Sequence, residues 1–355
     1  MNRKSDIAVK MGVLAAVVGL AAPGTALAQP ADPAIAYIAQ YTLQGKLRVD
    51  LTVANADGSH RTVIWSYPPS KWCPPLLHSP AWSPDLDGNP NNGYQGTIAV
   101  AIKHCASLGE PARLSLIDVV VTGGVPQGTN IRDLITSGVD PSVDDPSYIT
   151  SPEWSPDLDP LTPGYQGTLA FQGALNGVTT VSAIEMYWDG TTAQPVHGPN
   201  TSVVLWFPPV GNGPRFPTWS PDGQWLAFTY SDSIYIMEPS TGAIVDIVSG
   251  FPSTPGDLQW SRTGSRIGLL SGVGQVFTVD ADIGIASLEP VAAGAPCLLR
   301  ELTWSPDDLF IVFASVDCGN KDKWIIRQTN LANSQVTTLI SETGKDLRQP
   351  DWRRF

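Results

Sequence analysis

The feature that most constrains the fold of this chain is a repeat centred on tryptophan. The hexapeptide WSPDLD occurs at Trp82–Asp87 and again, letter for letter, at Trp154–Asp159. Related segments read TWSPDG, QWSRTG, TWSPDD and PDWRRF. The six tryptophans of the repeat, 41 to 72 residues apart, are Trp82, Trp154, Trp219, Trp260, Trp304 and Trp352. Self-similarity at such a period is typical of repeat architectures.

The segments that follow each tryptophan indicate strands. After Trp219 come WLAFTY, SIYIMEP and AIVDIV, and after Trp304 come LFIVFAS, KWIIRQT and QVTTLIS. These runs are rich in β-branched and aromatic residues and are separated by Gly, Asp, Asn, Ser and Pro. Each unit therefore reads as a strand carrying the tryptophan, a tight turn and three more strands. Four-stranded units around an axis form a β-propeller.

The two ends of the chain complete each other. The segments AIAYIAQY, LRVDLTVANA and RTVIWSY precede the first motif and lack a tryptophan strand of their own. The last motif, Asp351-Trp352, has no strands after it. We therefore predict an all-β fold, a six-bladed propeller in which the C-terminal strand joins the N-terminal blade and no open edge remains.

The motif Trp-Ser-Pro-Asp-Gly, followed by an apolar strand and a second strand ending in Asp-Gly, resembles the repeat of TolB-like propellers, which are relatives of the WD-type propellers. The resemblance covers nearly the whole chain after residue 28. TolB itself carries an α/β domain before its propeller, so the resemblance implies a TolB-like protein other than TolB, located in the periplasm. The tryptophans are expected to pack between blades, and the aspartates to accept hydrogen bonds in the turns.

The first 28 residues resemble an export signal. MNRKSDIAVK is basic, MGVLAAVVGLAAPG is apolar, and Ala26–Ala28 offers small residues for cleavage. We predict a signal peptide over residues 1–28 and a propeller domain over 29–355, secreted or periplasmic. The alternative is a retained membrane anchor. No later stretch is apolar enough to cross a membrane.

Charge excludes one class of partner. Removing Arg3, Lys4, Lys10 and Asp6 from the 21 basic and 33 acidic residues leaves 18 and 32, a net charge near −14. An acidic surface repels phosphate backbones, so we expect no nucleic-acid binding.

Four cysteines in an exported chain favour disulfides. Cys73 and Cys297 lie shortly before a motif tryptophan, whereas Cys105 and Cys318 end the second strand of the same blades. Because those positions share a face of a propeller, we predict the pairs Cys73–Cys105 and Cys297–Cys318, each contributing roughly 3–4 kcal/mol. The alternative is a zinc site that combines Cys73 and Cys105 with the nearby histidines. Those histidines are His78 and His104.

A calcium site is a weaker hypothesis. Asp85, Asp87 and Asn89 alternate in the turn after Trp82, as Ca²⁺ ligands often do, but the distal Glu of an EF-hand is missing. The competing interpretation is an extended turn duplicated from one blade to its neighbour. We predict no cofactor otherwise.

Sequence motifs for catalysis are scarce. Neither Gly-x-Ser-x-Gly nor His-Glu-x-x-His occurs, and the four histidines have no metal-ligand spacing. The acidic loop Ser137–Pro152 is the better functional candidate, since loops on a rigid scaffold carry binding. Its candidate partner contacts are Asp140, Asp144, Asp145 and Tyr148.

These patterns predict a non-catalytic scaffold that binds an envelope protein, a peptide or a glycan. The alternative is a hydrolase or lyase that acts on polysaccharide or peptide at the axial channel. Convergent buried carboxylates with raised pKa values would favour the enzyme, and a small polar or apolar lining would favour the scaffold.

Overall fold

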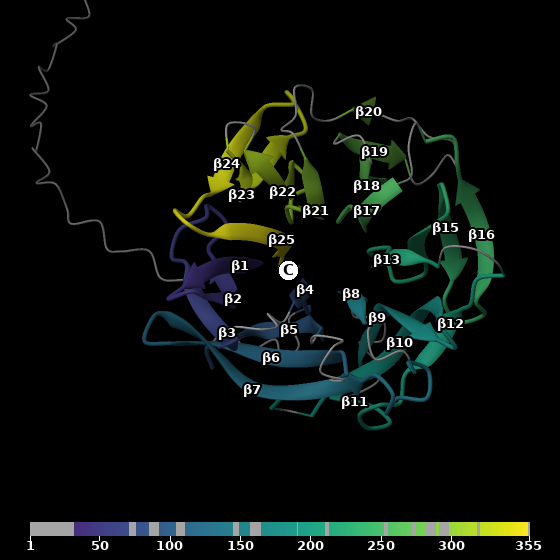
Figure 1. Ribbon diagram of the computed structural model, residues 1–355. Helices are drawn as coiled ribbons and strands as arrows, with labels where there is room; N and C mark the ends of the chain where they lie inside the picture. The colour runs from purple at the N-terminus through teal and green to yellow at the C-terminus, as the bar shows by residue number, and fades with distance from the viewer. Residues whose placement is uncertain are drawn as a thin grey trace, which may run out of the picture. The chain divides into compact units, whose positions relative to one another are not determined.

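A computed structural model of the chain forms a closed ring of six antiparallel sheets around a central axis (Figure 1). The structure describes residues 32–70, 76–84, 92–103, 111–144, 149–156, 165–189, 191–209, 213–251, 255–271, 275–280, 289–290, 298–317 and 320–353. Within these residues all regular elements are strands, and no helix long and apolar enough to span a membrane occurs. The prediction of an all-β, six-bladed propeller is confirmed.

The blades are numbered here from the N-terminus, and each is given from the axis outward. Blade 1 contains β25 (Asp346–Trp352), β1 (Ile35–Leu43), β2 (Lys46–Ala54) and β3 (Thr62–Ser70). Blade 2 contains β4 (Leu76–Trp82), β5 (Tyr94–Lys103), β6 (Arg113–Thr122) and β7 (Val125–Thr136). Blade 3 contains β8 (Thr150–Trp154), β9 (Tyr165–Leu175), β10 (Val178–Trp188), β11 (Ala193–Pro195) and β12 (Val203–Trp206).

The second half of the ring is built in the same way. Blade 4 contains β13 (Arg215–Trp219), β14 (Leu226–Tyr230), β15 (Ser233–Glu238) and β16 (Ala243–Val248). Blade 5 contains β17 (Pro255–Trp260), β18 (Arg266–Ser271), β19 (Val276–Asp280) and β20 (Glu289–Pro290). Blade 6 contains β21 (Leu299–Trp304), β22 (Phe310–Asp317), β23 (Asn320–Asn330) and β24 (Val336–Ile340).

The ring closes within blade 1, as the sequence predicts. The C-terminal strand β25 pairs antiparallel with β1, with Trp352 opposite Ile35. The side chains of this sheet pack with those of blade 6 in one buried cluster. Closure therefore joins the two ends of the propeller through a hydrogen-bonded ladder and an apolar core.

Blade 3 departs from the expected four strands because its outer strand is interrupted between β11 and β12. The interrupting segment turns toward blade 2. There Asn200 accepts a hydrogen bond from the Thr136 N–H at 2.7 Å and donates its own N–H to the Leu134 carbonyl at 3.0 Å. The segment between β11 and β12 therefore does not pair with β10 and instead forms hydrogen bonds that join blade 3 to blade 2.

The tryptophans lie at the junctions between blades. All six are buried, with exposed fractions between 1% for Trp154 and Trp304 and 6% for Trp352. In three of them the indole N–H bonds the residue before the tryptophan of the preceding blade: Trp154 bonds the Ala81 carbonyl, Trp219 that of Glu153, and Trp304 that of Gln259.

A second set of contacts crosses four junctions. Here the side chain of the residue before one motif tryptophan accepts a hydrogen bond from the backbone N–H of the motif tryptophan in the next blade. The acceptor and donor pairs are Thr218 with Trp260, Gln259 with Trp304, Thr303 with Trp352, and Asp351 with Trp82. These contacts, which we call the clasps, satisfy backbone donors at the centre of the ring that would otherwise be buried without a partner.

The turn after the motif is held by its serine and aspartate. Ser220 Oγ donates to Asp222 and accepts the Trp225 N–H at 2.9 Å, while Asp222 accepts the Gln224 N–H at 3.0 Å. Ser305 and Asp307 make the same contacts in blade 6. The predicted role of the aspartate as a turn acceptor is confirmed at both places.

Candidate functional site: the axial channel and its mouth

The innermost strands share an irregularity that shapes the axis. In every blade the strand register shifts just before the motif tryptophan. The residue three positions before the tryptophan has positive φ in five blades: Ser79, Ser151, Phe216, Glu301 and Gln349. Such bulges re-aim side chains. Here they bring the residues before each tryptophan to a narrow channel of about 50 Å³.

Carboxylates from four blades line this channel, among them Glu153 of blade 3. The lining includes Asp257 of blade 5, Glu301 of blade 6 and Asp351 of blade 1, and burial raises the pKa of all three. The pKa of Asp257 rises to about 8 and that of Glu301 to about 7. The negative charges of Glu301 and Asp351 add to the rise in the pKa of Asp257.

The three acids differ in their hydrogen bonds. Asp257 accepts the Leu302 N–H at 2.8 Å, and Asp351 accepts the Trp82 N–H at 2.7 Å, so both also join neighbouring blades. The Oε2 atom of Glu301 is buried and has no hydrogen-bond partner among the described residues. Glu301 therefore keeps an unused acceptor beside the channel.

Above the channel the axis opens into a wider cavity of about 330 Å³, which we call the mouth. Three arginines line it: Arg215, Arg300 and Arg348. Each occupies the position four residues before a motif tryptophan, and His78 holds the same position in blade 2. The mouth thus gathers basic groups in a chain whose net charge is −12.

Two of these arginines are oriented by an aromatic ring. The guanidinium carbons of Arg300 and Arg348 lie 5.4 and 5.1 Å from the centre of the buried Trp324 ring. Cation–π contacts of this kind hold a guanidinium while leaving its N–H donors free. Two carboxylates of the described residues lie near these groups: Asp346 is 4.0 Å from Arg348, and Glu301, which also lines the mouth, interacts electrostatically with both arginines.

The positive electrostatic potential at the mouth affects the pKa of its histidine, His78. Burial, together with the positive charges of Lys103 and Arg348, lowers the pKa of His78 to about 4. His78 is therefore neutral at physiological pH, with its Nδ1 atom 3.3 Å from Gln349 Nε2. A neutral histidine between basic groups indicates a mouth suited to anions.

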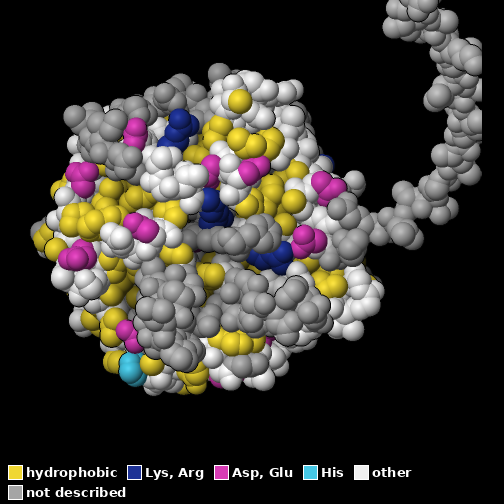
Figure 2. Space-filling model, turned by 180° about the vertical axis from the view of Figure 1, so that it is seen from behind, with side chains coloured by type: hydrophobic (Ala, Val, Ile, Leu, Met, Phe, Trp, Pro, Cys, Tyr) yellow, Lys and Arg dark blue, Asp and Glu magenta, His cyan; other side chains and the backbone are white. Residues whose placement is uncertain are grey.

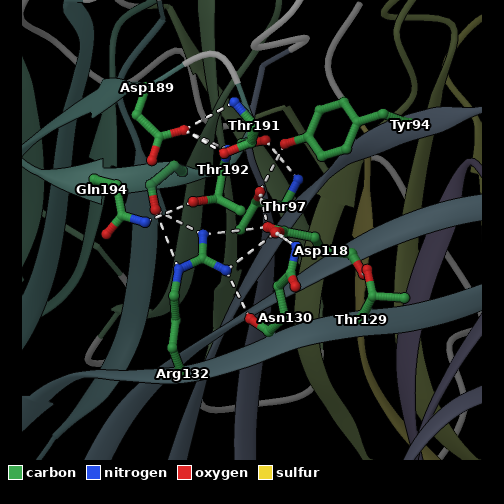
Figure 3. A network of polar contacts seen from close by, with 12 residues as sticks. Tyr94, Thr97, Asp118, Thr129, Asn130, Arg132, Asp189, Thr191, Thr192 and Gln194 are labelled. Atoms are coloured by element: carbon green, nitrogen blue, oxygen red, sulfur yellow. Dashed lines mark hydrogen bonds and ion pairs between the residues drawn. The ribbon is translucent and has the colours of Figure 1, made fainter. Parts of the chain in front are cut away.

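Another buried acid, Asp118, lies away from the axis and has its hydrogen bonds completed by neighbouring side chains (Figure 3). Asp118 of β6 is 1% exposed and accepts hydrogen bonds from Thr97 at 2.7 Å, from Asn130 at 3.2 Å and from both terminal nitrogens of Arg132. Arg132 also donates to the Ala193 carbonyl of blade 3 at 2.6 Å. This network, which we call the junction network, is complete within the protein and joins two blades.

The structure covers part of the loop that the sequence singles out. Asp140 is 1% exposed, and its carboxylate accepts hydrogen bonds from Ser142 and Ser202, so it holds the loop in place. Asp144 is exposed and accepts the Asn176 N–H at 2.8 Å. Asp145 and Tyr148 lie outside the described residues.

Other predicted sites also fall outside the described residues. These are the four cysteines Cys73, Cys105, Cys297 and Cys318, the histidine His104, and the calcium candidates Asp85, Asp87 and Asn89. Within the described ranges no group of three or more His, Cys, Asp or Glu residues is placed to hold a metal ion.

Sequence reasoning missed the arginines of the mouth and the acids of the channel. The signal was present: a residue followed by Pro, one more residue and the tryptophan recurs in four blades, at Pro80, Pro152, Pro217 and Pro350. Because proline lacks an N–H, this pattern marks the bulge before each tryptophan. Counting positions back from the tryptophan would have aligned Arg215, Arg300 and Arg348.

Comparison with solved structures identifies the fold. TolB from Acinetobacter baumannii superposes with a TM-score of 0.59 at 19% identity, covering 91% of this chain and 67% of that one. The fold is that of the TolB propeller. A protein of Agrobacterium tumefaciens assigned to TolB superposes with a TM-score of 0.53 at 16% identity, covering 88% of this chain and 91% of that one.

A chain of the nidogen/laminin complex matches with a TM-score of 0.50 at 12% identity, covering 90% of this chain and 98% of that one. No protein-family model and no curated protein sequence matches the chain. At these identities the likeness to TolB propellers establishes the architecture only, and function has to be inferred from the residues of the site.

Proposed function

We propose that the protein is an exported β-propeller scaffold whose channel mouth binds an acidic segment of a protein or peptide in the cell envelope. The observation that carries this proposal is the alignment of Arg215, Arg300 and Arg348 around one cavity of about 330 Å³. Guanidinium groups recognise carboxylates through paired N–H donors. A strongly acidic chain that concentrates arginines at its axis is suited to select an anionic partner.

Export rests on the sequence of residues 1–28 and on the likeness of the propeller to TolB structures. We propose that cleavage after residue 28 releases a propeller domain of residues 29–355. An oxidising compartment would allow the pairs Cys73–Cys105 and Cys297–Cys318, which mass spectrometry without reductant would detect.

The acidic loop extends the proposed docking surface. Its last residues, Thr150 and Ser151, line the mouth, so a partner held by the arginines would meet the loop as well. Asp144, Asp145 and Tyr148 remain our candidates for contacts there, whereas the buried Asp140 supports the loop from inside.

The experiment compares capture of envelope proteins by two variants of the full chain after crosslinking in cells. The triple variant Arg215→Ala/Arg300→Ala/Arg348→Ala should lose the partner that the unchanged protein captures. The control Lys46→Ala/Arg266→Ala removes exposed basic residues away from the mouth and should retain it. Equal capture by both variants would show that the arginines do not bind the partner.

The alternative function is an enzyme that acts on polysaccharide or peptide at the axis. It is favoured by the buried carboxylates that converge on the channel, Asp257, Glu301 and Asp351, whose pKa values burial raises. Glu301 also has a pKa near 7 and an unused buried oxygen. The narrow channel opposes it, because about 50 Å³ holds only a few water molecules. If the partner is degraded by the unchanged protein but captured intact by the variant Glu301→Gln, the enzyme replaces the scaffold.

A further inference from the structure

Away from the axis, a cavity lies between blades 4 and 5. It has a volume of about 640 Å³ and is lined by two indoles, Trp225 and Trp260, together with Asp222 and Asp246. A neighbouring groove of about 560 Å³ between blades 3 and 4 shares Trp225 and carries Glu185 and Glu238. Both volumes are in the range of ligand-binding clefts.

Charge in these grooves has a single sign. Among the described residues neither groove is lined by a Lys or Arg, whereas each is lined by two carboxylates. Acidic and hydrophobic side chains intermingle over the face seen in Figure 2, where few basic side chains are visible. The grooves and the mouth therefore differ in the sign of charge that they favour.

The carboxylates retain capacity to accept hydrogen bonds. Asp222 uses Oδ1 for its turn contacts with Ser220 and Gln224, and Asp246 uses Oδ1 for the Ile247 N–H at 2.7 Å. No hydrogen bond is recorded for the Oδ2 atom of either residue in the described structure. Two acceptors thus flank an aromatic wall in an open groove.

The aromatic wall distinguishes this junction from the others. Six residues after its motif tryptophan, blade 4 has Trp225, whereas blade 5 has Arg266 and blade 6 has Phe310. Trp225 packs its partly buried ring against the core of blades 4 and 5 and lines both grooves, so it forms the crest between them. Indole is the strongest cation–π partner among side chains.

We propose that the grooves on either side of Trp225 bind a basic peptide, with a Lys or Arg side chain lying over the indole and paired with Asp222 or Asp246. The apolar stem of such a side chain would cover Ile236 and Val245, which also line the larger groove. This surface is separate from the mouth and takes a partner of opposite charge.

The test is a calorimetric titration of tetralysine into the full propeller in 20 mM salt. The variant Asp222→Asn/Asp246→Asn should weaken tetralysine binding at least fivefold. Asparagine can still accept the turn N–H, so the fold should be kept. The variant Trp225→Phe should weaken binding as well, because a phenyl ring is a poorer partner for a cation.

The chain offers a matched control. Asp307 makes the same turn contacts in blade 6 as Asp222 does in blade 4, but Phe310 stands there in place of the indole. The variant Asp307→Asn should bind tetralysine within twofold of the unchanged protein. An equal loss of binding free energy per removed charge in Asp307→Asn and in Asp222→Asn/Asp246→Asn would mean that net charge alone attracts the peptide, and would overturn the proposal.

A neutral oligosaccharide tests the other possible ligand of the groove, a glycan. Chitotetraose should show no binding that depends on Trp225. Binding of chitotetraose without binding of tetralysine would make the groove a glycan site and would also overturn the proposal. The triple arginine variant of the mouth should leave tetralysine binding intact, so failure of this inference is distinguishable from failure of the proposed function.

Discussion

The junction network and the channel mouth both place a buried acid near arginine, yet they differ in how far their hydrogen bonds are completed. Asp118 receives donors from Thr97, Asn130 and Arg132. Glu301 has an oxygen without a donor, and Arg300 and Arg348 rest on Trp324 beside it. Where every oxygen of the buried acid accepts a hydrogen bond, the acid joins neighbouring blades. Where an oxygen has no donor, it can still accept a hydrogen bond from a ligand.

The largest effect is expected where the junction network is broken. The variant Arg132→Ala leaves Asp118 buried without its cation, which should lower the free energy of unfolding by about 3–5 kcal/mol. Urea unfolding measures this directly. In the same blade the exposed pair Arg113–Asp133, whose side chains are 40% exposed, provides the control. Arg113→Ala should lower the free energy by less than about 1 kcal/mol. Equal losses would remove the distinction between the network and ordinary surface pairs.

A smaller effect, of opposite sign, is expected at the mouth. Burial raises the pKa of Glu301 above its unfolded value of 4.5 to about 7. The folded state then binds a proton that the unfolded state releases, so stability is fully present below about pH 4.5 and falls as the pH rises through 7. The variant Glu301→Gln has no carboxyl group to ionise, so it does not lose stability in this way. At pH 8 its free energy of unfolding should exceed that of the unchanged protein by about 1.4 kcal/mol for each unit by which folding raises the pKa of Glu301.

Urea unfolding at pH 4.5 and pH 8 checks the second prediction. The difference between Glu301→Gln and the unchanged protein should be near zero at pH 4.5 and largest at pH 8. Asp118→Asn should instead destabilise the protein at pH 8, because an amide cannot pair with Arg132. A destabilising Glu301→Gln at pH 8 would mean that Glu301 is structural in the same way as Asp118.

The difference between these regions also explains what the sequence can reveal. The tryptophan repeat predicted the blades and the closure, because packing at a junction requires the same large residue at the same place in every blade. Arg215, Arg300 and Arg348 escaped notice because each is a single substitution within a repeat. They become a site only when the ring brings three distant strands to one axis. Asp118 and Arg132 were missed for a different reason: they lie 14 residues apart on the paired strands β6 and β7, and no sequence motif marks either of them.

Asp140 was expected at the surface, but its side chain is buried. Its place in an acidic loop suggested a surface contact, but its bonds to Ser142 and Ser202 put it inside. Composition records the charge of a loop, whereas only the structure shows which charges the loop uses for itself.

The most direct test of the account is a calorimetric titration of hexaglutamate into the full propeller at 20 mM and 150 mM salt. The unchanged protein should bind this acidic peptide, more weakly at the higher salt, and the variant Arg215→Ala/Arg300→Ala/Arg348→Ala should lose at least tenfold in affinity while unfolding at the same urea concentration. Undiminished hexaglutamate binding in a folded triple variant would contradict the claim that the mouth is an anion-binding site.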